Sequence, residues 1–263
     1  MARVAFGAAL AAVGSLALLG GVGWSGLQVG PAPFPPHPQR TRELGTADLP
    51  PDLPEPARGH FRATLGERAP RIETAVVWGR FNLNGLWFPM RFESYNVAGR
   101  EFRRDMELAW FGAPVFRGYD AYLDGKGTLK ITGLFGLIKV SGEGEKFDQG
   151  DNLAMWAEAP FTTPSALVLD PRIRWDPIDA SSARLVVPFK GGEDSLRVAF
   201  DPETGLITRV FGMRFRDQEE TKTPWHGESS EWRTIHGIKV PHRPAGVWED
   251  WEGPYVILDL EGA

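Results

Sequence analysis

Apolar and polar residues alternate along most of the chain after residue 70, in short runs that turn signals separate. A clear run is 195–201, where Leu196, Val198 and Phe200 fall on one face and charged or small residues on the other. Such alternation predicts β-strands with one buried face. Glycine-containing segments such as 124–127 predict the turns between them, because glycine readily adopts the positive φ of hairpin turns. The pattern therefore predicts about ten strands at hairpin spacing, without the strand–helix–strand alternation of a parallel sheet.

The stretch 148–169 departs from this alternation. Leu153, Trp156 and Ala157 are spaced as one apolar face of a helix, and short polar side chains before them can cap its start. We expect the helix to end at Pro160, because proline has no N–H to donate. A single helical insert in a chain of strands is expected to cover one face of the sheet.

These elements predict a mainly β (α+β) fold. We expect one β-rich domain over residues 57–263, in which a helical insert at residues 150–169 covers a curved antiparallel sheet or half-open barrel of about ten strands. A two-sheet sandwich is the alternative, and the isolated insert favours the half-barrel. The domain is expected to begin with a short helix over Ala57–Leu65, which places His60 on a solvated face.

The first 25 residues have the composition of a targeting segment. After Arg3, the run Val4–Trp24 contains no charged residue, which is typical of a signal peptide or an N-terminal transmembrane anchor. Its length suits an anchor, since about 20 residues span a bilayer, whereas its many small residues suit a cleaved signal. Residues 26–56 are expected to form a proline-rich linker that cannot build a packed core. Both interpretations predict export, either anchored to the cell membrane through the N-terminal segment or free in the periplasm or extracellular space.

The composition excludes several classes of function. The chain has no cysteine, which rules out disulfides, thiol catalysis and thiolate metal sites. Its formal net charge of −5 argues against a nucleic-acid partner, since phosphate contacts need a basic patch. His226, His236 and His242 are close in sequence, but their spacing fits no common metal motif. No phosphate loop or nucleophile elbow is present, so we expect neither a metal nor a cofactor.

Four carboxylates beside aromatic residues offer a hydrolase as one alternative: Glu158, Asp176, Asp179 and Asp201. An acid–base pair for glycoside chemistry needs two carboxylates roughly 5–9 Å apart in a cleft, and Glu158 could face Asp176. Structural roles compete with this interpretation. Asp179 and Asp201 suit turns, and Glu158 could pair with Arg174 or Arg172. No catalytic residue is therefore assigned.

Aromatic residues are the remaining signal, since the chain has ten tryptophans. Each aromatic side chain buries roughly 150–250 Å², so a packed core accounts for them without a ligand. The functional alternative is an apolar pocket with a few polar groups at its mouth, and a glycine-flanked segment before the insert could guard its entrance. The residues that we expect to line such a pocket are Trp110, Phe135, Leu137, Leu153, Trp156, Glu158, Trp175, Phe211, Trp225 and Trp248.

Short motifs lie in a distinctive order between Gly150 and Trp248. They are Trp156-Ala-Glu-Ala-Pro160, Arg174-Trp-Asp-Pro-Ile-Asp179, Phe200-Asp-Pro-Glu-Thr-Gly-Leu-Ile207, Thr223-Pro-Trp225 and Gly237-Ile-Lys-Val-Pro241. This order resembles an uncharacterised bacterial family of exported or membrane-anchored proteins, which carries no established activity. More distantly, it resembles the periplasmic lipoprotein-carrier half-barrels. That second resemblance implies an apolar cavity between a curved sheet and helices, although a fold does not fix a function.

The first hypothesis for function is a non-catalytic binding module at the cell envelope, which holds a lipid or other apolar ligand between the sheet and the insert. A structural or interaction domain with a solid core is the alternative, and the hydrolase is the second alternative. Two residues distinguish them. A Trp156 that lines a cavity indicates a functional lid, whereas a fully packed Trp156 beside a paired Glu158 indicates architecture.

Overall fold

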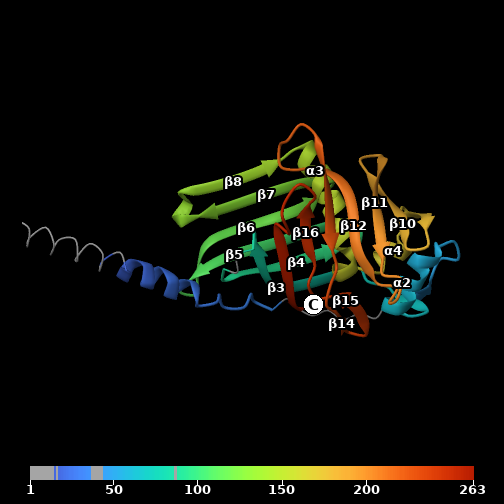
Figure 1. Cartoon of the computed structure of the whole chain (residues 1–263), viewed down its shortest axis with the longest axis horizontal. Coiled ribbons are helices and arrows are strands. Elements are labelled where there is room, and N and C mark those ends of the chain that lie inside the picture. Colours follow the sequence, from blue (N-terminus) through green and yellow to red (C-terminus); the bar gives the residue numbers. More distant parts are fainter. Residues whose placement is uncertain (1–14, 16, 37–43, 86–87) are drawn as a thin grey trace, which may run out of the picture.

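The computed structural model describes residues 15, 17–36, 44–85 and 88–263, and one large curved sheet dominates them (Figure 1). Within this described part, thirteen strands pair in antiparallel fashion and the sheet does not close. Their spatial order is β8 (Ile138–Glu143), β7 (Lys126–Gly133), β6 (Ala113–Leu123), β5 (Glu101–Trp110), β4 (Met90–Val97), β3 (Thr74–Leu83), β17 (Val256–Gly262), β16 (Ala245–Trp248), β13 (Lys222–Glu228), β12 (Ile207–Phe215), β11 (Gly192–Phe200), β10 (Ser182–Phe189) and β9 (Arg174–Asp179). The predicted mainly β fold with a curved antiparallel sheet is confirmed, with more strands than expected.

The sheet consists of two runs of hairpins joined at its centre. Strands β3 to β8 follow one another in sequence, and strands β9 to β13 with β16 and β17 make the other run. The two runs meet where β17 pairs with β3, with Val256 opposite Leu83 and Leu260 opposite Gly79. The first and last strands of the main sheet therefore lie side by side.

Helix α3 (Glu145–Thr162) and the short α4 (Ala166–Leu169) form the insert. Helix α3 contacts β6, β7 and β8 on one flank of the sheet and β10, β11 and β12 on the other. Polar side chains fix it in place, since Gln149 Nε2 donates to Asp194 Oδ2 (2.7 Å) and to the Met213 carbonyl (2.9 Å). Asn152 Nδ2 donates to the Pro188 carbonyl (3.2 Å). The curved sheet thus encloses the helix, which is why its polar residues are buried as well.

The helix differs from its sequence-based prediction at both ends. It begins at Glu145 rather than near residue 150, and it continues through Pro160 to Thr162, so the expectation that Pro160 ends it is wrong. Proline removes one backbone donor, but the N–H of Thr163 still donates to the Ala159 carbonyl (3.0 Å). Packing between the two flanks of the sheet holds this last turn in helical form.

Ordered structure also begins before residue 57. In the described part of the predicted linker, β1 (Thr46–Asp48) pairs with β2 (Arg68–Pro70). Helix α2 (Glu55–Leu65) starts two residues before the expected helix and ends at the same residue. A separate hairpin, β14 (Trp232–Ile235) with β15 (Ile238–Pro241), packs beside the main sheet. A short 3₁₀ turn, η1 (Leu134–Gly136), joins β7 to β8.

His60 lies in the core, and its predicted place on a solvated face is wrong. Its ring packs against Phe61, Phe200 and Trp232, and it is 2% exposed. Its Nδ1 accepts a hydrogen bond from the backbone N–H of Ile207 (3.2 Å). Burial lowers the pKa of His60 to about 3, so the imidazole is neutral at physiological pH. Histidine is a polar residue, so the sequence predicts a solvated position. The structure buries the ring because its Nδ1 accepts a hydrogen bond from a backbone N–H inside the core.

The predicted signal or anchor, residues 1–25, lies partly outside the described residues. Residues 17–27 are helical, and Gly23 and Gly26 of this stretch contact the β5–β6 turn. Within the described part of the chain, no helix is long and apolar enough to cross a membrane.

Candidate functional site: an apolar cavity beside the helical insert

A cavity of about 1120 Å³ opens between the centre of the sheet and the last turn of α3. Val76 and Trp78 of β3 and Phe92 of β4 form the sheet side of the wall. Phe161 of α3 and Ile238 of β15 form the opposite side. The lining is therefore mostly apolar and comes from segments far apart in the sequence.

The cavity exists because one edge of β3 is only partly covered. Strand β17 reaches only to Gly262, which lies opposite Trp78, so the first residues of β3 pair with β4 alone. The carbonyl of Glu73 accepts from the N–H of Ala98, which turns alternate backbone groups of β3 toward β4. The backbone N–H and C=O of Thr74 and Val76 consequently face away from β4, on the side where the cavity lies.

Two flanking segments complete the wall. The β14–β15 hairpin contributes Ile235 and Val240, which also pack in the apolar cluster around Phe161. Residues 30–36 of the proline-rich segment cross the other side, where the ring of Phe34 lies 3.8 Å from the guanidinium of Arg91. This contact is a cation–π interaction, which fixes the segment over the cavity.

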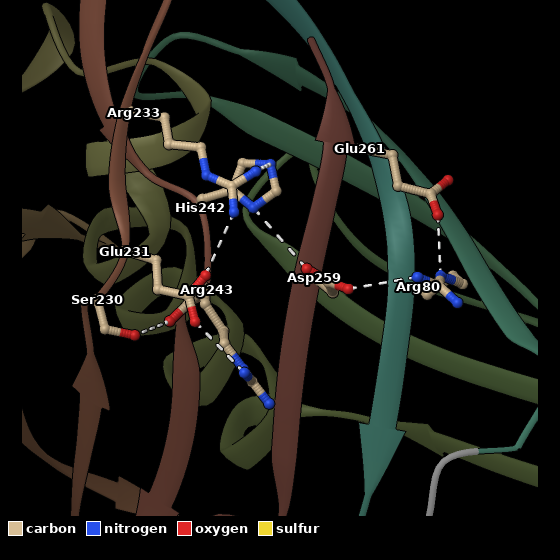
Figure 2. Close-up of polar contacts among 8 residues, drawn as sticks. All are labelled: Arg80, Ser230, Glu231, Arg233, His242, Arg243, Asp259 and Glu261. Carbon is tan, nitrogen blue, oxygen red and sulfur yellow. Dashed lines mark hydrogen bonds and ion pairs between the residues drawn. The ribbon is translucent and has the colours of Figure 1, made fainter.

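Two charged residues of the lining, Arg80 and Glu261, take part in the polar contacts that Figure 2 shows. Arg80 of β3 lines the cavity, and its Nε lies 2.9 Å from Glu261 Oε1. The same guanidinium lies 3.5 Å from Asp259 Oδ2 on β17. Arg80 is more than half exposed, so these pairs leave its charge accessible to a polar ligand group at the mouth.

The polar contacts continue from Asp259 to the β14–β15 hairpin (Figure 2). Arg233 donates to His242 Nε2 (3.2 Å), which leaves the proton of a neutral ring on Nδ1, 3.8 Å from Asp259 Oδ1. Burial and the neighbouring Arg233 lower the pKa of His242. Arg233 and Arg243 both reach Glu231, at 3.4 Å and 3.3 Å. This set of contacts ties the hairpin, which is one wall of the cavity, to the central strand β17.

The space beneath the middle of α3 contains charges instead of an apolar pocket. Glu158 of α3 forms an ion pair with Arg104 of β5, and Arg104 lies opposite Asp120 of β6. On the other flank, Arg214 Nη2 lies 3.9 Å from Asp151 Oδ1. Burial raises the pKa of Asp120 and raises that of Asp151 well above its ordinary value, and in Asp151 the nearby Asp120 adds to the shift. The sheet flanks and α3 therefore share a compensated charge cluster.

Five of the ten predicted ligand-binding residues lie in the packed core: Leu153, Trp156, Trp175, Trp225 and Trp248. Trp156 is 1% exposed and Glu158 is paired with Arg104, which is the arrangement expected of architecture. Trp175 Nε1 donates to the Leu167 carbonyl (2.7 Å), which ties α4 to β9. None of these side chains lines the 1120 Å³ cavity.

Of the other five predicted residues, Glu158 and Phe211 are half-buried, and Trp110, Phe135 and Leu137 are exposed. Phe211 and Trp225 line a smaller hollow of about 310 Å³. Trp110 is 40% exposed and donates from Nε1 to the Gly23 carbonyl (3.1 Å). Phe135 and Leu137 lie at the tip of the β7–β8 hairpin, away from the cavity lining. The structure thus does not bring the ten residues together around one space.

The carboxylates proposed for a hydrolase are engaged in structural contacts. Asp176 Oδ1 accepts from Arg174 Nε (3.0 Å), and Asp179 accepts from Ser182 Oγ (2.7 Å). Asp201 Oδ1 accepts from the backbone N–H of Thr204 (2.7 Å) in the turn after β11. Within the described residues, no group of three histidine, aspartate or glutamate side chains is placed to hold a metal ion.

Sequence reasoning missed the residues that do line the cavity. Val76, Trp78 and Phe92 lie in strands whose alternation was visible, but the pattern does not reveal that β17 leaves part of β3 uncovered. Phe161 directly follows the proline that was expected to end the helix. A helix prediction extended by one turn would have placed Phe161 on the sheet side.

Comparison with known proteins places these observations in a family. No curated protein matches the chain significantly. Among solved structures, the chain is similar to a LolA superfamily protein from Nitrosomonas europaea, with 7% identity, 72% of this chain and 83% of that chain covered, and a TM-score of 0.39. It is also similar to a DUF1329 family protein from Desulfovibrio piger, with 13% identity, coverage of 72% and 82%, and a TM-score of 0.38. The model of the family of unknown function DUF6544 matches residues 43–260, and the chain therefore belongs to that family.

Proposed function

We propose that the protein is a non-catalytic binding module that holds a lipid or another elongated apolar molecule in the 1120 Å³ cavity. The observation that carries the proposal is the cavity itself, with a mostly apolar lining and a few charged side chains, among them Arg80, Arg91 and Glu261. Ligand pockets are typically about 300–1,000 Å³ and combine an apolar wall with a few polar groups that orient the ligand. An acyl chain would pack against Trp78, Phe92 and Phe161, and a polar head group would lie near Arg80.

The proposal keeps the expected position between sheet and insert but moves the site along the helix. The last turn of α3 supplies Phe161 and Thr162 to the cavity. Trp156 instead lies in the filled part of the trough, by which we mean the space between the two sheet flanks that α3 occupies. Capture of a ligand would then require movement of the walls rather than of α3. The β14–β15 hairpin and residues 30–36 are those walls.

We further propose that binding takes place in the cell envelope. The uncharged run Val4–Trp24 is the support for export, and the formal net charge of −5 argues against a nucleic-acid partner. A structural or interaction domain remains the second candidate, because packed Trp156 and paired Glu158 give α3 a sufficient role as core.

Native mass spectrometry tests whether the chain carries a ligand. The full chain is purified in detergent, and the detergent is removed in the gas phase before the mass is measured. The expected result is an apolar adduct at one copy per chain. The test variant is Val76→Trp, which places a large ring on the half-buried cavity wall and should reduce the adduct several-fold. The control variant is Val115→Trp, which makes the same change at a half-buried β6 position that does not line the cavity.

Circular dichroism and urea denaturation would first establish that both variants are folded. Loss of the adduct in Val76→Trp alone supports the proposal. No adduct on the unsubstituted chain, or equal retention by both variants, contradicts it and favours the solid-core candidate.

A further inference from the structure

One end of the sheet carries a group of exposed apolar side chains, which we call the apolar end. Its members lie in or beside the β3–β4, β5–β6 and β7–β8 turns: Leu83, Phe88, Trp110, Phe111, Leu134, Phe135 and Leu137. Phe135 is fully exposed and Leu137 is 85% exposed. Contiguous apolar surface of this kind on a folded protein marks contact with a partner or a membrane.

Strand order explains why these turns gather at one end. Strands β3 to β8 are antiparallel neighbours, so every second turn lies on the same side. The alternate turns at the opposite end contain Gly99 with Arg100, and Asp124 with Gly125, and are polar or small. The exposed apolar side chains are therefore concentrated at one end of the sheet, although Leu123, which is 41% exposed, lies beside a turn at the other end.

The β7–β8 turn presents its apolar residues in an unusual backbone conformation. Leu134 and Phe135 have φ values of 46° and 58°, in the left-handed region that residues with side chains rarely adopt. Neither side chain is buried in return. The strained turn thus directs Phe135 into the surroundings of the protein instead of into its core.

The N-terminal helical stretch identifies the partner, because it docks on the apolar end. Trp110 Nε1 donates to the Gly23 carbonyl (3.1 Å), and the Phe111 N–H donates to the Gly26 carbonyl (2.8 Å). Gly26 is required for this approach, since a Cβ there would lie 2.0 Å from Trp110 Nε1. The helix, which Figure 1 shows in blue beside this end of the sheet, also exposes Leu18 and Trp24, which belong to the uncharged run Val4–Trp24.

We propose that the apolar end of the sheet rests on a lipid bilayer, with Phe135 and Leu137 inserted among the lipids. Aromatic and aliphatic side chains at the edge of a membrane gain free energy by leaving water, and tryptophan favours the interface. The helical residues 17–27 and the hairpin tips then meet the same membrane from one side of the molecule. This contact is independent of the cavity and of any ligand in it.

The absence of native cysteine makes a site-specific test simple. The full chain carrying Phe135→Cys is labelled with the fluorophore NBD and reconstituted into vesicles of phosphatidylethanolamine and phosphatidylglycerol. We expect a several-fold rise in emission relative to the labelled chain in detergent-free denaturant, and strong quenching by lipids that carry a doxyl group in the acyl chain. The matched control is Asp124→Cys, at a hairpin tip on the opposite end, which should show neither effect.

A second label at Leu137→Cys guards against a local effect of one substitution and should behave as Phe135→Cys does. Equal emission from labels at positions 135 and 124 overturns the proposal. A raised emission at position 135 that doxyl lipids do not quench also overturns it, because the tip is then covered by protein, such as a second copy of this chain. Loss of the cavity adduct would leave these results unchanged, so the two proposals fail separately.

Discussion

Glu158 on α3 forms an ion pair with Arg104 on β5, and the two side chains are only 22% and 11% exposed. The pair connects the helix in the trough to the first half of the sheet. Removal of one partner from a buried pair leaves an uncompensated charge in a medium of low polarity. Two apolar side chains of similar size would remove both charges of this pair, although Asp120 would then lose Arg104 as a cationic neighbour.

We therefore expect Glu158→Leu to lower the free energy of unfolding by about 3–5 kcal/mol. The double variant Arg104→Met with Glu158→Leu should recover only part of this loss, because Asp120 and Asp151 then have Arg214 alone as a cationic neighbour. Urea denaturation followed by tryptophan fluorescence measures both. As a matched control, Asp105→Ala removes one partner of the exposed Arg103–Asp105 pair and should cost about 1 kcal/mol or less. A double variant no more stable than Glu158→Leu would show that the ion pair is not the main contribution.

Local patterns in the sequence predicted the hairpins and the helices well. The alternation of Leu196, Val198 and Phe200 corresponds to β11, and these side chains all lie in the core. Helix α2 ends at Leu65 as expected. In each case the signal is local, because the period of the apolar residues reflects which face of the element is buried.

The cavity and the sheet order could not be predicted in this way. Both depend on the pairing of β3 with β17, whose residues lie more than 170 positions apart in the chain. No turn or period specifies that pairing, nor that it ends at Trp78 and Gly262. Likewise, the apolar period predicts the insert only from residue 150, because Glu145 gains its helical environment from the surrounding sheet flanks.

Gly99, in the turn between β4 and β5, allows Trp156 to approach the backbone. Gly99 has φ +63°, and a Cβ there would lie 2.8 Å from Trp156 Cη2 and 2.6 Å from Asp170 Oδ2. We expect Gly99→Ala to lower the free energy of unfolding by about 2–4 kcal/mol, from backbone strain and from displacement of the indole. Urea denaturation measures the loss, and near-ultraviolet circular dichroism reports the environment of Trp156.

Gly125 is the matched control for this substitution. It has φ +75°, but a Cβ there would meet only Tyr122 Oη at 4.0 Å. Gly125→Ala should therefore cost only the backbone strain, about 1–2 kcal/mol, and leave the near-ultraviolet spectrum unchanged. Equal losses for the two variants would indicate that Trp156 adjusts without cost.

His60 makes the stability of the protein depend on pH below neutrality. Its pKa is lowered to about 3 in the folded state, so the unfolded chain binds a proton that the folded chain does not. The contribution of His60 to the free energy of unfolding should accordingly be nearly constant above pH 6.5 and should fall as the pH drops toward 3. Between pH 7 and pH 5 the loss amounts to about 2 kcal/mol.

The variant His60→Asn tests this origin of the pH dependence. An asparagine oxygen can accept from the Ile207 N–H as Nδ1 does, but it does not titrate. Urea denaturation at pH 7 and pH 5 measures the free energy of unfolding. The difference between the two pH values should be about 2 kcal/mol smaller in this variant than in the unsubstituted chain. His236→Asn, on the hairpin tip, leaves His60 in place and should retain the full loss. An unchanged pH profile in His60→Asn would contradict the assignment.

Asp151 should make stability depend on pH in the opposite sense to His60, because its contribution falls as the pH rises. Burial and the neighbouring Asp120 raise its pKa well above the ordinary value, although Arg214 and Arg104 oppose the shift and Glu158 adds to it. The folded chain then retains a proton that the unfolded chain loses. Stability from this group is full below the unfolded pKa near 3.8 and declines as the pH rises toward the folded pKa, by at most about 1.4 kcal/mol per pH unit.

Asp151→Asn mimics the protonated carboxyl and removes this decline. We expect the variant to gain stability relative to the unsubstituted chain as the pH rises from 5 to 8, measured by urea denaturation at each pH. Asp201→Asn is the control of opposite sign, because hydrogen bonds from Thr204 hold the pKa of Asp201 below its ordinary value. Its difference from the unsubstituted chain should be constant over the same range. A constant difference for Asp151→Asn as well would mean that Arg214 and Arg104 keep the carboxylate charged inside the fold, and that the trough holds one net negative charge.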